Sequence, residues 1–372
     1  MNEKPSFLSS WAGPIITGLA IGILAPLLVL WGNPGNMGFC IACFERDIAG
    51  ALGFHRAAVV QYIRPEVIGL ILGALVAALA AGEFKPRAGS SPVVRFFLGF
   101  FAMIGALIFL GCPWRAMLRL AGGDWNAIVG IAGLVVGILV GIQCLNGGFS
   151  LGRSYPAPQE AKIGGFVLPV VALGLLALLL IAPKFGPEGA GPIFFSEKGP
   201  GSMHAPIVYS LIVALVVGFL CQKSRFCTIG AIRDLVIARD PHLFWGLVTL
   251  IVVAMGTNMY LGMFKPGFSG QPIAHTDGVW NFLGMVLAGL AFTLAGGCPG
   301  RQLIMAGEGD GDAAAFVIGM VFGAAASHNF GLASSGAGIG AHAPYAFGIG
   351  LLFCLIVGFA MRRQLRIEGG KQ

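Results

Sequence analysis

Two cysteine motifs, each present in both halves of the sequence, contain the residues best suited to chemistry. The first motif is Gly-Cys-Pro-x-Arg, and its copies lie 186 residues apart: Gly111-Cys112-Pro113-Trp114-Arg115 and Gly297-Cys298-Pro299-Gly300-Arg301. Proline is tolerated in the first turn of a helix, where its missing N–H would have no partner. We therefore predict that Cys112 and Cys298 occupy helix N-caps, where free amides and the positive end of the helix dipole attract anions.

The groups of this motif together describe a site for a small anion. Arg115 and Arg301 follow their cysteines by about one helical turn and add fixed positive charge. A thiol beside a helix N-terminus favours an anion that contains polarisable sulfur or selenium. Three other cysteines have no counterpart in the repeat and are interpreted as small buried hydrophobic residues, namely Cys144, Cys221 and Cys354.

The second motif is Phe-Cys followed by Arg-Asp, with its copies 187 residues apart. Its chemistry-bearing residues are Cys40, Arg46 and Asp47 in the first half and Cys227, Arg233 and Asp234 in the second. We expect Cys40 and Cys227 to line the same path as the first pair of cysteines. Ionisable residues at membrane depth are costly and usually functional. The four charged residues are therefore interpreted either as a gate or as anchors at the membrane interface.

Cys40 and Cys43 also form a Cys-x-x-Cys motif. The counterpart of Cys43 in the second half is Gly230, and the sequence contains no second Cys-x-x-Cys to complete a zinc site. We therefore expect no metal site. A membrane thiol-disulfide oxidoreductase that uses Cys40 and Cys43 remains the alternative function.

The composition determines the kind of molecule that must position these residues. Of 372 residues, 56% are hydrophobic and 10% charged, whereas soluble domains have about 25% charged residues. Apolar runs of about 18 residues or more can cross the bilayer. We predict an all-α polytopic membrane protein with no nucleic-acid partner. A nucleotide-binding GxxxxGK[ST] motif does not occur, and we expect neither a cofactor nor an enzymatic activity with catalytic residues.

Ten apolar stretches are predicted to span the membrane, each with an approximate range: 11–31, 66–82, 93–110, 127–145, 163–182, 206–222, 243–263, 279–297, 313–330 and 344–361. Four further segments contain the motifs and are too short to cross, so they are predicted to be re-entrant or broken helices: 36–50, 111–123, 224–239 and 297–309.

The repeated motifs divide the sequence into two membrane repeats, residues 1–182 and 206–372, joined by a Pro/Gly-rich linker over residues 183–205. Because each repeat has an odd number of spans, we predict that the second is inverted relative to the first. In such transporters the substrate binds near the midplane, where broken helices from both repeats meet. Glycine ladders such as Gly133/Gly137 and Gly319/Gly323 are interpreted as helix-packing faces. The alternative is a duplicated scaffold whose motifs are only tight turns.

The distribution of basic residues predicts the orientation. Lys and Arg are more frequent on the side that holds both termini, including Arg362, Arg363 and Arg366. The positive-inside rule therefore places both termini in the cytoplasm and the linker outside.

At its motifs the chain resembles the YeeE/YedE family of bacterial inner-membrane sulfur-transport proteins, over nearly its whole length. The segments Gly35–Phe44, Arg46-Asp47, His55-Arg56 and Gln61–Glu66 resemble the YedE/FdhT branch, which is linked with selenium metabolism. The resemblance implies a constriction at Cys112 and Cys298, with Cys40 close by and Cys227 as its mate. It also implies a TusA-like cytoplasmic carrier protein as a partner. The longer linker and Cys43 depart from the thiosulfate-importing branch.

These observations predict an inner-membrane permease that imports a small anion through a waist lined by thiols. A selenium species is the favoured substrate, followed by a thiosulfate-like anion. Besides the oxidoreductase, a non-transporting membrane scaffold for selenium-delivery enzymes is a third interpretation.

Overall fold

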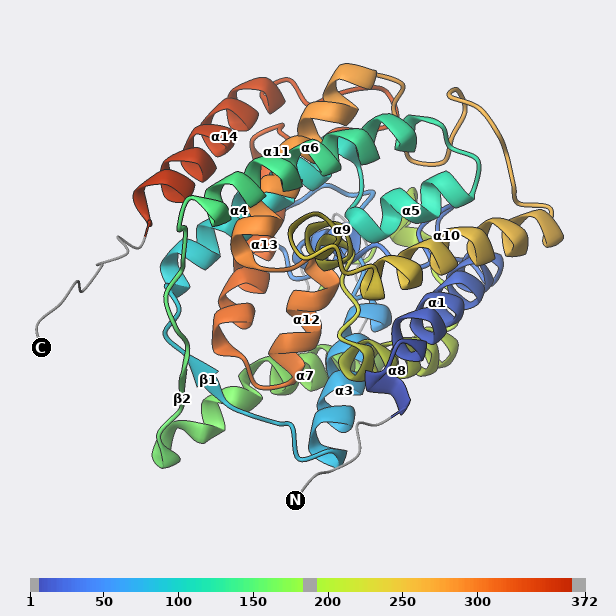
Figure 1. Ribbon diagram of the computed structural model, residues 1–372. Helices are drawn as coiled ribbons and strands as arrows, with labels where there is room; N and C mark the ends of the chain where they lie inside the picture. The colour runs from blue at the N-terminus through green and yellow to red at the C-terminus, as the bar shows by residue number, and fades with distance from the viewer. Residues whose placement is uncertain (1–6, 183–192, 363–372) are drawn as a thin grey trace, which may run out of the picture.

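The computed structural model describes residues 7–182 and 193–362, and this part of the chain is a bundle of α-helices (Figure 1). Its only strands are β1 (Arg87–Ala88) and β2 (Tyr155–Pro156), which pair antiparallel. Short 3-10 helices cover Phe7–Ser9, Gln159–Phe166 and Pro200–Ser202. The prediction of an all-α polytopic membrane protein is confirmed.

Each of the ten predicted spans is an α-helix. They are α1 (Ala12–Leu30), α3 (Pro65–Ala80), α4 (Pro92–Phe109), α6 (Asn126–Asn146), α7 (Val167–Ile181), α8 (Ile207–Ser224), α10 (His242–Tyr260), α11 (Gly278–Ala295), α13 (Gly311–Asn329) and α14 (Ala343–Ala360). In the described ranges, nine helical segments are long and apolar enough to cross a bilayer. The remaining predicted span, α3, is an apolar helix of 16 residues, shorter than the others.

The four motif segments are short helices, as predicted. They are α2 (Ile41–Ala51), α5 (Pro113–Ala121), α9 (Thr228–Ile237) and α12 (Pro299–Gly307). At 1.5 Å per residue none of them spans the ~30 Å of hydrocarbon. Figure 1 shows α9 and α12 near the centre of the bundle, surrounded by long helices. The short helices are therefore placed to present their first residues inside the protein.

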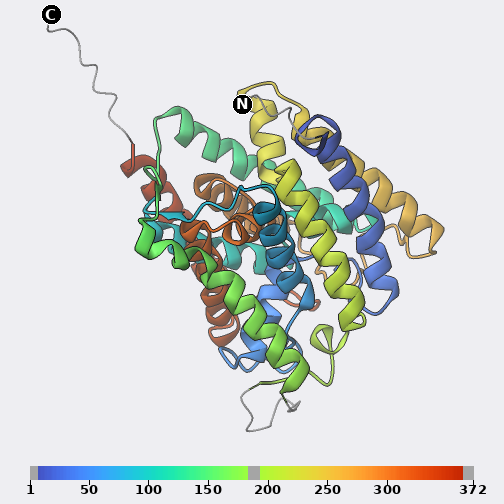
Figure 2. The same cartoon turned by 90° about the horizontal axis from the view of Figure 1, so that it is seen from below.

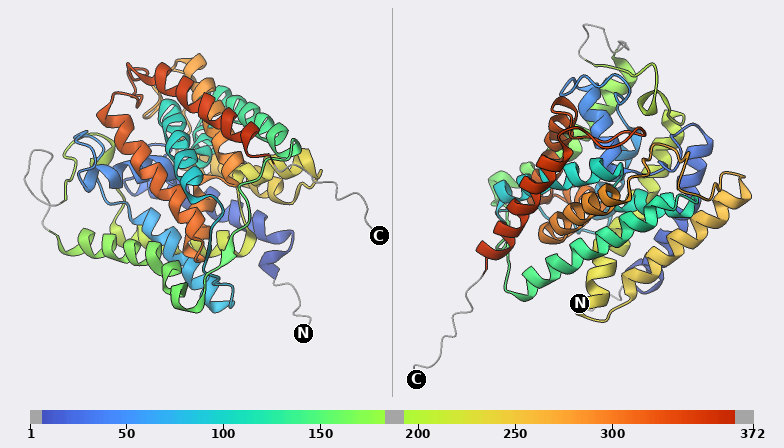
Figure 3. Two further views of the ribbon diagram at one scale, coloured as in Figure 1. Left: turned by 90° about the vertical axis from the view of Figure 1, so that its left-hand side faces the viewer. Right: turned by 90° about the horizontal axis from the view of Figure 1, so that it is seen from above.

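Helices of the first half pack mainly on helices of the second half. The main contacts join α1 to α10, α3 to α8, α4 to α13 and to α11, and α6 to α11. When α1–α7 are matched with α8–α14 in order, the α1/α10 contact corresponds to α8/α3, and the α4/α13 contact to α11/α6. The halves therefore interlock in matched pairs, although the proposed repeat boundaries and the inversion stay predictions. The last helices of each half, α7 and α14, lie on the outside of the bundle (Figures 2 and 3).

The glycine ladders bring these helices close together. A Cβ on Gly137 of α6 would lie 2.2 Å from the carbonyl oxygen of Val286 in α11, and one on Gly319 of α13 would lie 2.0 Å from that of Phe96 in α4. Only glycine allows the two backbones to approach this closely. The packing role predicted for the ladders is confirmed.

Candidate functional site

The four motif cysteines occupy equivalent positions on the short helices. Cys40, Cys112, Cys227 and Cys298 are the N-cap residues of α2, α5, α9 and α12, and all four have extended backbone conformations. Each side chain is buried. The N-cap positions predicted for Cys112 and Cys298 are therefore confirmed, and Cys40 and Cys227 lie at the same kind of position.

The thiols form two pairs, one in each half. The side chain of Cys40 contacts that of Cys112, and the side chain of Cys227 contacts that of Cys298. In the second pair, the backbone N–H of Cys298 also donates to Cys227 Sγ at 3.4 Å. Each pair thus joins one cysteine from each motif and places two helix N-termini side by side.

Backbone amides complete the surroundings of the sulfur atoms. The N–H of Cys43 donates to Cys40 Sγ at 3.4 Å, and the N–H of Gly230 donates to Cys227 Sγ at 3.3 Å. These contacts are the usual N-cap interaction with sulfur in place of oxygen. The repeat is therefore preserved at the level of individual hydrogen bonds.

Trp114 packs against the residues that precede two of the motif cysteines. Its ring centroid is 6.2 Å from that of Phe39 and 6.0 Å from that of Phe226, and these two residues directly precede Cys40 and Cys227. A Cβ on Gly300, the counterpart of Trp114 in the repeat, would lie 2.7 Å from the indole. The sequence analysis did not identify this packing role of Trp114. The signal for it is that the residue at the same position of the second repeat is a glycine, which leaves space for the indole.

Several buried donors beside the cysteines have no hydrogen-bond partner among the described residues. They are Trp114 Nε1, Arg115 Nε and the hydroxyl of Thr228, the residue that follows Cys227. Leaving a buried polar group without a partner costs about 1–3 kcal/mol. An anion can accept hydrogen bonds from such groups, so these donors and the thiols together can bind an anion.

Arg115 is fully buried close to the first thiol pair. Its guanidinium donates to the carbonyl oxygens of Leu110, Pro272 and Ile273 and lies 3.7 Å from Cys43 Sγ. Over residues 7–182 and 193–362 it forms no ion pair. Arg115 is therefore a buried positive charge without an ion-pair partner among the described residues.

Arg301, the counterpart of Arg115, has a different environment. Its guanidinium donates to Glu308 Oε1 at 3.0 Å, and Glu308 also accepts from Arg225 at 2.9 Å. Glu308 thus offsets the charge of Arg301. The sequence predicted equivalent roles for the two arginines, and the structure places them in unequal electrostatic surroundings.

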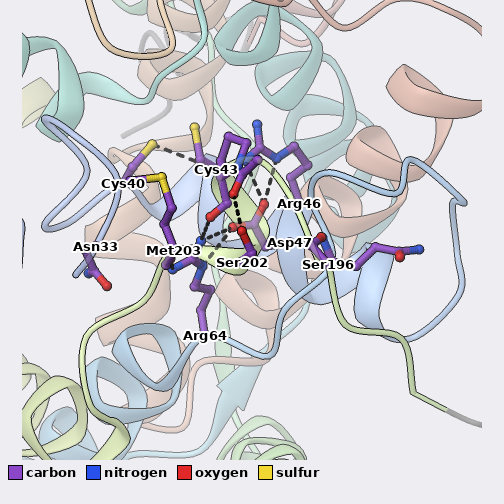
Figure 4. Close-up of polar contacts among 12 residues, drawn as sticks. Asn33, Cys40, Cys43, Arg46, Asp47, Arg64, Ser196, Ser202 and Met203 are labelled. Carbon is purple, nitrogen blue, oxygen red and sulfur yellow. Dashed lines mark hydrogen bonds and ion pairs between the residues drawn. The ribbon is translucent and has the colours of Figure 1, made fainter. Parts of the chain in front are cut away.

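Arg46 and Asp47 form a buried ion network with Arg64 (Figure 4). Asp47 accepts from Arg46 at 2.7 Å and from Arg64 at 2.8 Å, and all three side chains are almost fully buried. Arg64 also donates to the carbonyl oxygens of Pro200 and Met203, at 2.7 and 3.0 Å. One carboxylate thereby pairs with two guanidinium groups, of which that of Arg64 also contacts the described part of the linker.

The counterpart pair, Arg233 and Asp234, lies nearer the surface. The two side chains pair with each other at 2.8 Å and are 28% and 33% exposed. The matched motif therefore gives a buried network in α2 and a half-exposed pair in α9.

The linker residues that the structure describes pack against the segment that precedes α3. The N–H of Ser196 donates to the carbonyl oxygen of Gln61 at 2.8 Å, and the N–H of Gln61 donates to Ser196 Oγ at 2.8 Å. The N–H of Ala205 donates to Asn33 Oδ1 at 2.9 Å. Residues 193–205 therefore lie across the end of the molecule that contains Arg64, whereas residues 183–192 are outside the described part.

All eight cysteines are free thiols. Within the described ranges, no group of three or more His, Cys, Asp or Glu side chains is arranged to hold a metal ion. The arrangement therefore offers thiols, amides and guanidinium groups to a substrate, and these groups suit an anion.

Comparison with known proteins gives the family. A family model described as sulphur transport matches residues 3–140 and 223–359. The chain is 31% identical over 111 residues to the thiosulfate transporter TsuA of Escherichia coli (strain K12), which covers 29% of this chain and 30% of the relative. It is 27% identical over 99 residues to TsuA of Spirochaeta thermophila, covering 27% and 29%. The alignments thus span less than a third of these relatives. The match of the family model in both halves shows that the chain belongs to the YeeE/YedE sulphur-transport family.

Proposed function

We propose that this protein is an inner-membrane permease that imports a small sulfur-containing oxyanion of the thiosulfate type, without enzymatic activity. The observation that supports it best is the pair of thiol contacts, Cys40–Cys112 and Cys227–Cys298, at four helix N-termini with unpartnered donors beside them. Both similar proteins described above are named thiosulfate transporters.

The proposed mechanism begins with electrostatic attraction. The positive charge of Arg115 and the N-termini of the short helices draw the anion into a region of low dielectric. The thiols then donate S–H hydrogen bonds to the anion and replace part of its water shell. No covalent bond to sulfur forms, so the anion passes from one thiol pair to the other beside Trp114.

The charged residues of the second motif divide between the two roles that the sequence left open. The burial of Arg46 and Asp47, together with their link through Arg64 to the linker, favours a gate on the linker side. The partial exposure of Arg233 and Asp234 favours an anchor at the opposite interface. In the proposed orientation the termini are cytoplasmic, and the gate faces the outside.

The resemblance of the first half to the YedE/FdhT branch supports a selenium species, the substrate favoured from the sequence, as the alternative to the thiosulfate-type anion. A selenium oxyanion would have the charge and polarisability that the thiols and Arg115 require. A TusA-like carrier would take the imported atom at the cytoplasmic side. Uptake of labelled selenite and labelled thiosulfate into proteoliposomes, each in competition with the other, decides which species the permease prefers.

The thiol mechanism is tested by Cys112→Ala and Cys298→Ala in the same uptake assay. A hydrogen bond to a charged group contributes about 1.5–3 kcal/mol, so we expect each variant to lose at least about tenfold in the uptake rate. Cys354→Ala is the matched control, since Cys354 is buried but belongs to neither thiol pair, and it retains uptake. Full uptake by Cys112→Ala or Cys298→Ala would refute the mechanism.

A thiol-disulfide oxidoreductase is the second candidate, because the side chains of Cys40 and Cys43 are in contact. The variant Cys43→Ser separates the two functions. Serine retains a hydroxyl acceptor near Arg115, so the permease keeps most of its uptake, whereas an oxidoreductase loses all activity. Two observations together would favour the oxidoreductase: loss of uptake in Cys43→Ser, and a Cys40–Cys43 disulfide in the purified wild-type protein.

A further inference from the structure

Glu45 has a carboxyl group with no partner inside the bundle. Its residue exposure is 1%, and neither Oε1 nor Oε2 has a hydrogen-bond partner among the described residues. It forms no ion pair in that part of the chain. The proposed path for the anion does not use this group, so its presence needs another explanation.

Glu45 lies on the face of α2 opposite the thiol path. At about 100° per residue, Cys43 and Asp47 fall on one side of the helix, whereas Glu45 and Leu52 fall on the other. Figure 4 shows Cys43, Arg46 and Asp47 gathered with Arg64 on the first side. The same short helix therefore presents groups suited to the anion on one face and an isolated carboxyl on the other.

The carboxyl group borders an apolar cavity of about 230 Å³. Residues from α3, α7, α12 and α13 form the walls, among them Ile68, Leu168, Leu175, Leu303 and Val321. Apart from Glu45, every residue that lines the cavity is apolar.

The other charged and titratable groups of the surrounding elements lie outside the cavity lining. On α2, Asp47 pairs with Arg46 and Arg64, and on α12, Arg301 pairs with Glu308. On α3, Glu66 Oε1 accepts from Asn33 and Ser210, and on α13, Asp312 accepts from Gly89 and Ser90. His328 of α13 packs on His55, and its Nε2, like Glu66 Oε2, has no hydrogen-bond partner among the described residues. The described residues of α7 include no charged side chain. None of these groups lines the cavity, so none of them neutralises Glu45.

An ionised carboxylate without a partner in such surroundings carries a large desolvation cost, whereas a protonated carboxyl carries much less. In this conformation Glu45 therefore holds a proton. The counterpart of Glu45 in the second repeat, 187 residues later, is Ile232. An apolar side chain thus fits the equivalent place in the fold, and packing does not require the carboxyl group.

We propose that Glu45 binds the proton that drives import, so that the protein is a proton–anion symporter. This inference rests on the proposed permease function and adds the coupling ion. Importing an anion against an inside-negative potential is unfavourable. Thiosulfate carries two negative charges, so each co-transported proton offsets half of that electrical cost. The proton binds a Glu45 oxygen from the outer side and leaves to the cytoplasmic side, and no electron is transferred. Because α2 also contains Cys43 and Asp47, a movement of this helix that opens the thiol path also brings Glu45 to water.

The protonated state is tested on the wild-type protein with dicyclohexylcarbodiimide, an apolar reagent that adds to protonated carboxyl groups. We expect mass spectrometry of the reconstituted protein to find the adduct on the peptide that contains Glu45, with labelling that falls as the pH is raised. Glu45→Gln abolishes this adduct. A water-soluble carbodiimide instead modifies the exposed Glu160. Absence of the adduct at Glu45, or labelling independent of pH, overturns the inference.

The coupling is tested by thiosulfate uptake into proteoliposomes with and without an inside-alkaline pH gradient. A gradient of about one pH unit supports about tenfold more accumulation per co-transported proton. We expect wild type and Glu160→Gln to show this increase and Glu45→Gln to lose it. If Glu45→Gln does not insert, wild type treated with dicyclohexylcarbodiimide serves in its place and also loses the response.

The outcomes separate this inference from the proposed function. Cysteine-dependent uptake that does not respond to the gradient overturns the symport and leaves the permease intact. Uptake by Glu45→Gln that responds to the gradient as wild type does has the same meaning. Absence of uptake for both thiosulfate and selenite overturns the permease and the symport together.

Discussion

At the scale of single residues, a side chain at the same motif position makes different contacts in each half. Asp47 is buried between two guanidinium groups, whereas Asp234 pairs with a single arginine at the surface. The duplicated sequence made these residues equivalent, but burial makes their contributions to stability unequal. A carboxylate that neutralises buried arginines cannot be removed without leaving unpaired charge inside the protein.

The first prediction compares these two counterparts. Asp47→Asn removes the negative charge between Arg46 and Arg64, and we expect it to lower the free energy of unfolding by about 3–5 kcal/mol. Asp234→Asn removes a half-exposed pair and changes it by about 1 kcal/mol or less. Thermal unfolding of the two variants in detergent measures the difference. Equal shifts in the melting temperature would contradict the buried network.

At the scale of elements, the starts of the short helices could be predicted from the sequence. Proline after cysteine marks the first turn of α5 and α12, and the matched positions of Cys40 and Cys227 mark α2 and α9. These signals are local, because a helix N-terminus is determined by the residues at its cap and first turn. The existence of all four helices therefore followed from the motifs.

The contacts between these helices could not be predicted in the same way. Trp114 and Gly300 occupy equivalent places in the motif, but only the packed structure reveals that the indole of one fills the space beside the other. The link from Arg64 to Asp47 and to the linker carbonyls also joins residues distant in sequence. Such contacts depend on how the halves interlock, for which a single sequence by itself contains no signal.

The second prediction concerns the contact of α5 with α12. Gly300→Ala places a methyl group 2.7 Å from the Trp114 ring, so the indole must shift. We expect a several-fold change in the uptake rate. In Gly348→Ala, the matched control, the added methyl group meets no atom within 4 Å apart from the neighbouring backbone of its own helix, and helix propensity favours alanine by about 1 kcal/mol. Equal uptake by Gly300→Ala and wild type would remove Trp114 from the path.

At the scale of the whole molecule, the function depends on how the two halves are oriented. Because α8 is the counterpart of α1 and α10 is the counterpart of α3, the contact of α1 with α10 is matched by the contact of α8 with α3. A two-fold relation between the halves produces this exchange, and an axis in the membrane plane would make the repeats inverted. The thiol pairs would then face the membrane from opposite sides, so that an anion meets one pair first and the other second.

The third prediction tests this arrangement with single cysteines and a membrane-impermeant maleimide. All eight native thiols are buried, so labelling should report only the added one. Lys198→Cys lies in the linker, and Lys85→Cys and Ser269→Cys lie in the corresponding loops after α3 and α10. All three positions are exposed. We expect Lys198→Cys and Ser269→Cys to be labelled on intact cells, and Lys85→Cys only after permeabilisation. Labelling of Lys85→Cys and Ser269→Cys from the same side would contradict the inversion. Labelling of Lys85→Cys alone on intact cells would keep the inversion and reverse the orientation, which would place the Arg64 gate in the cytoplasm.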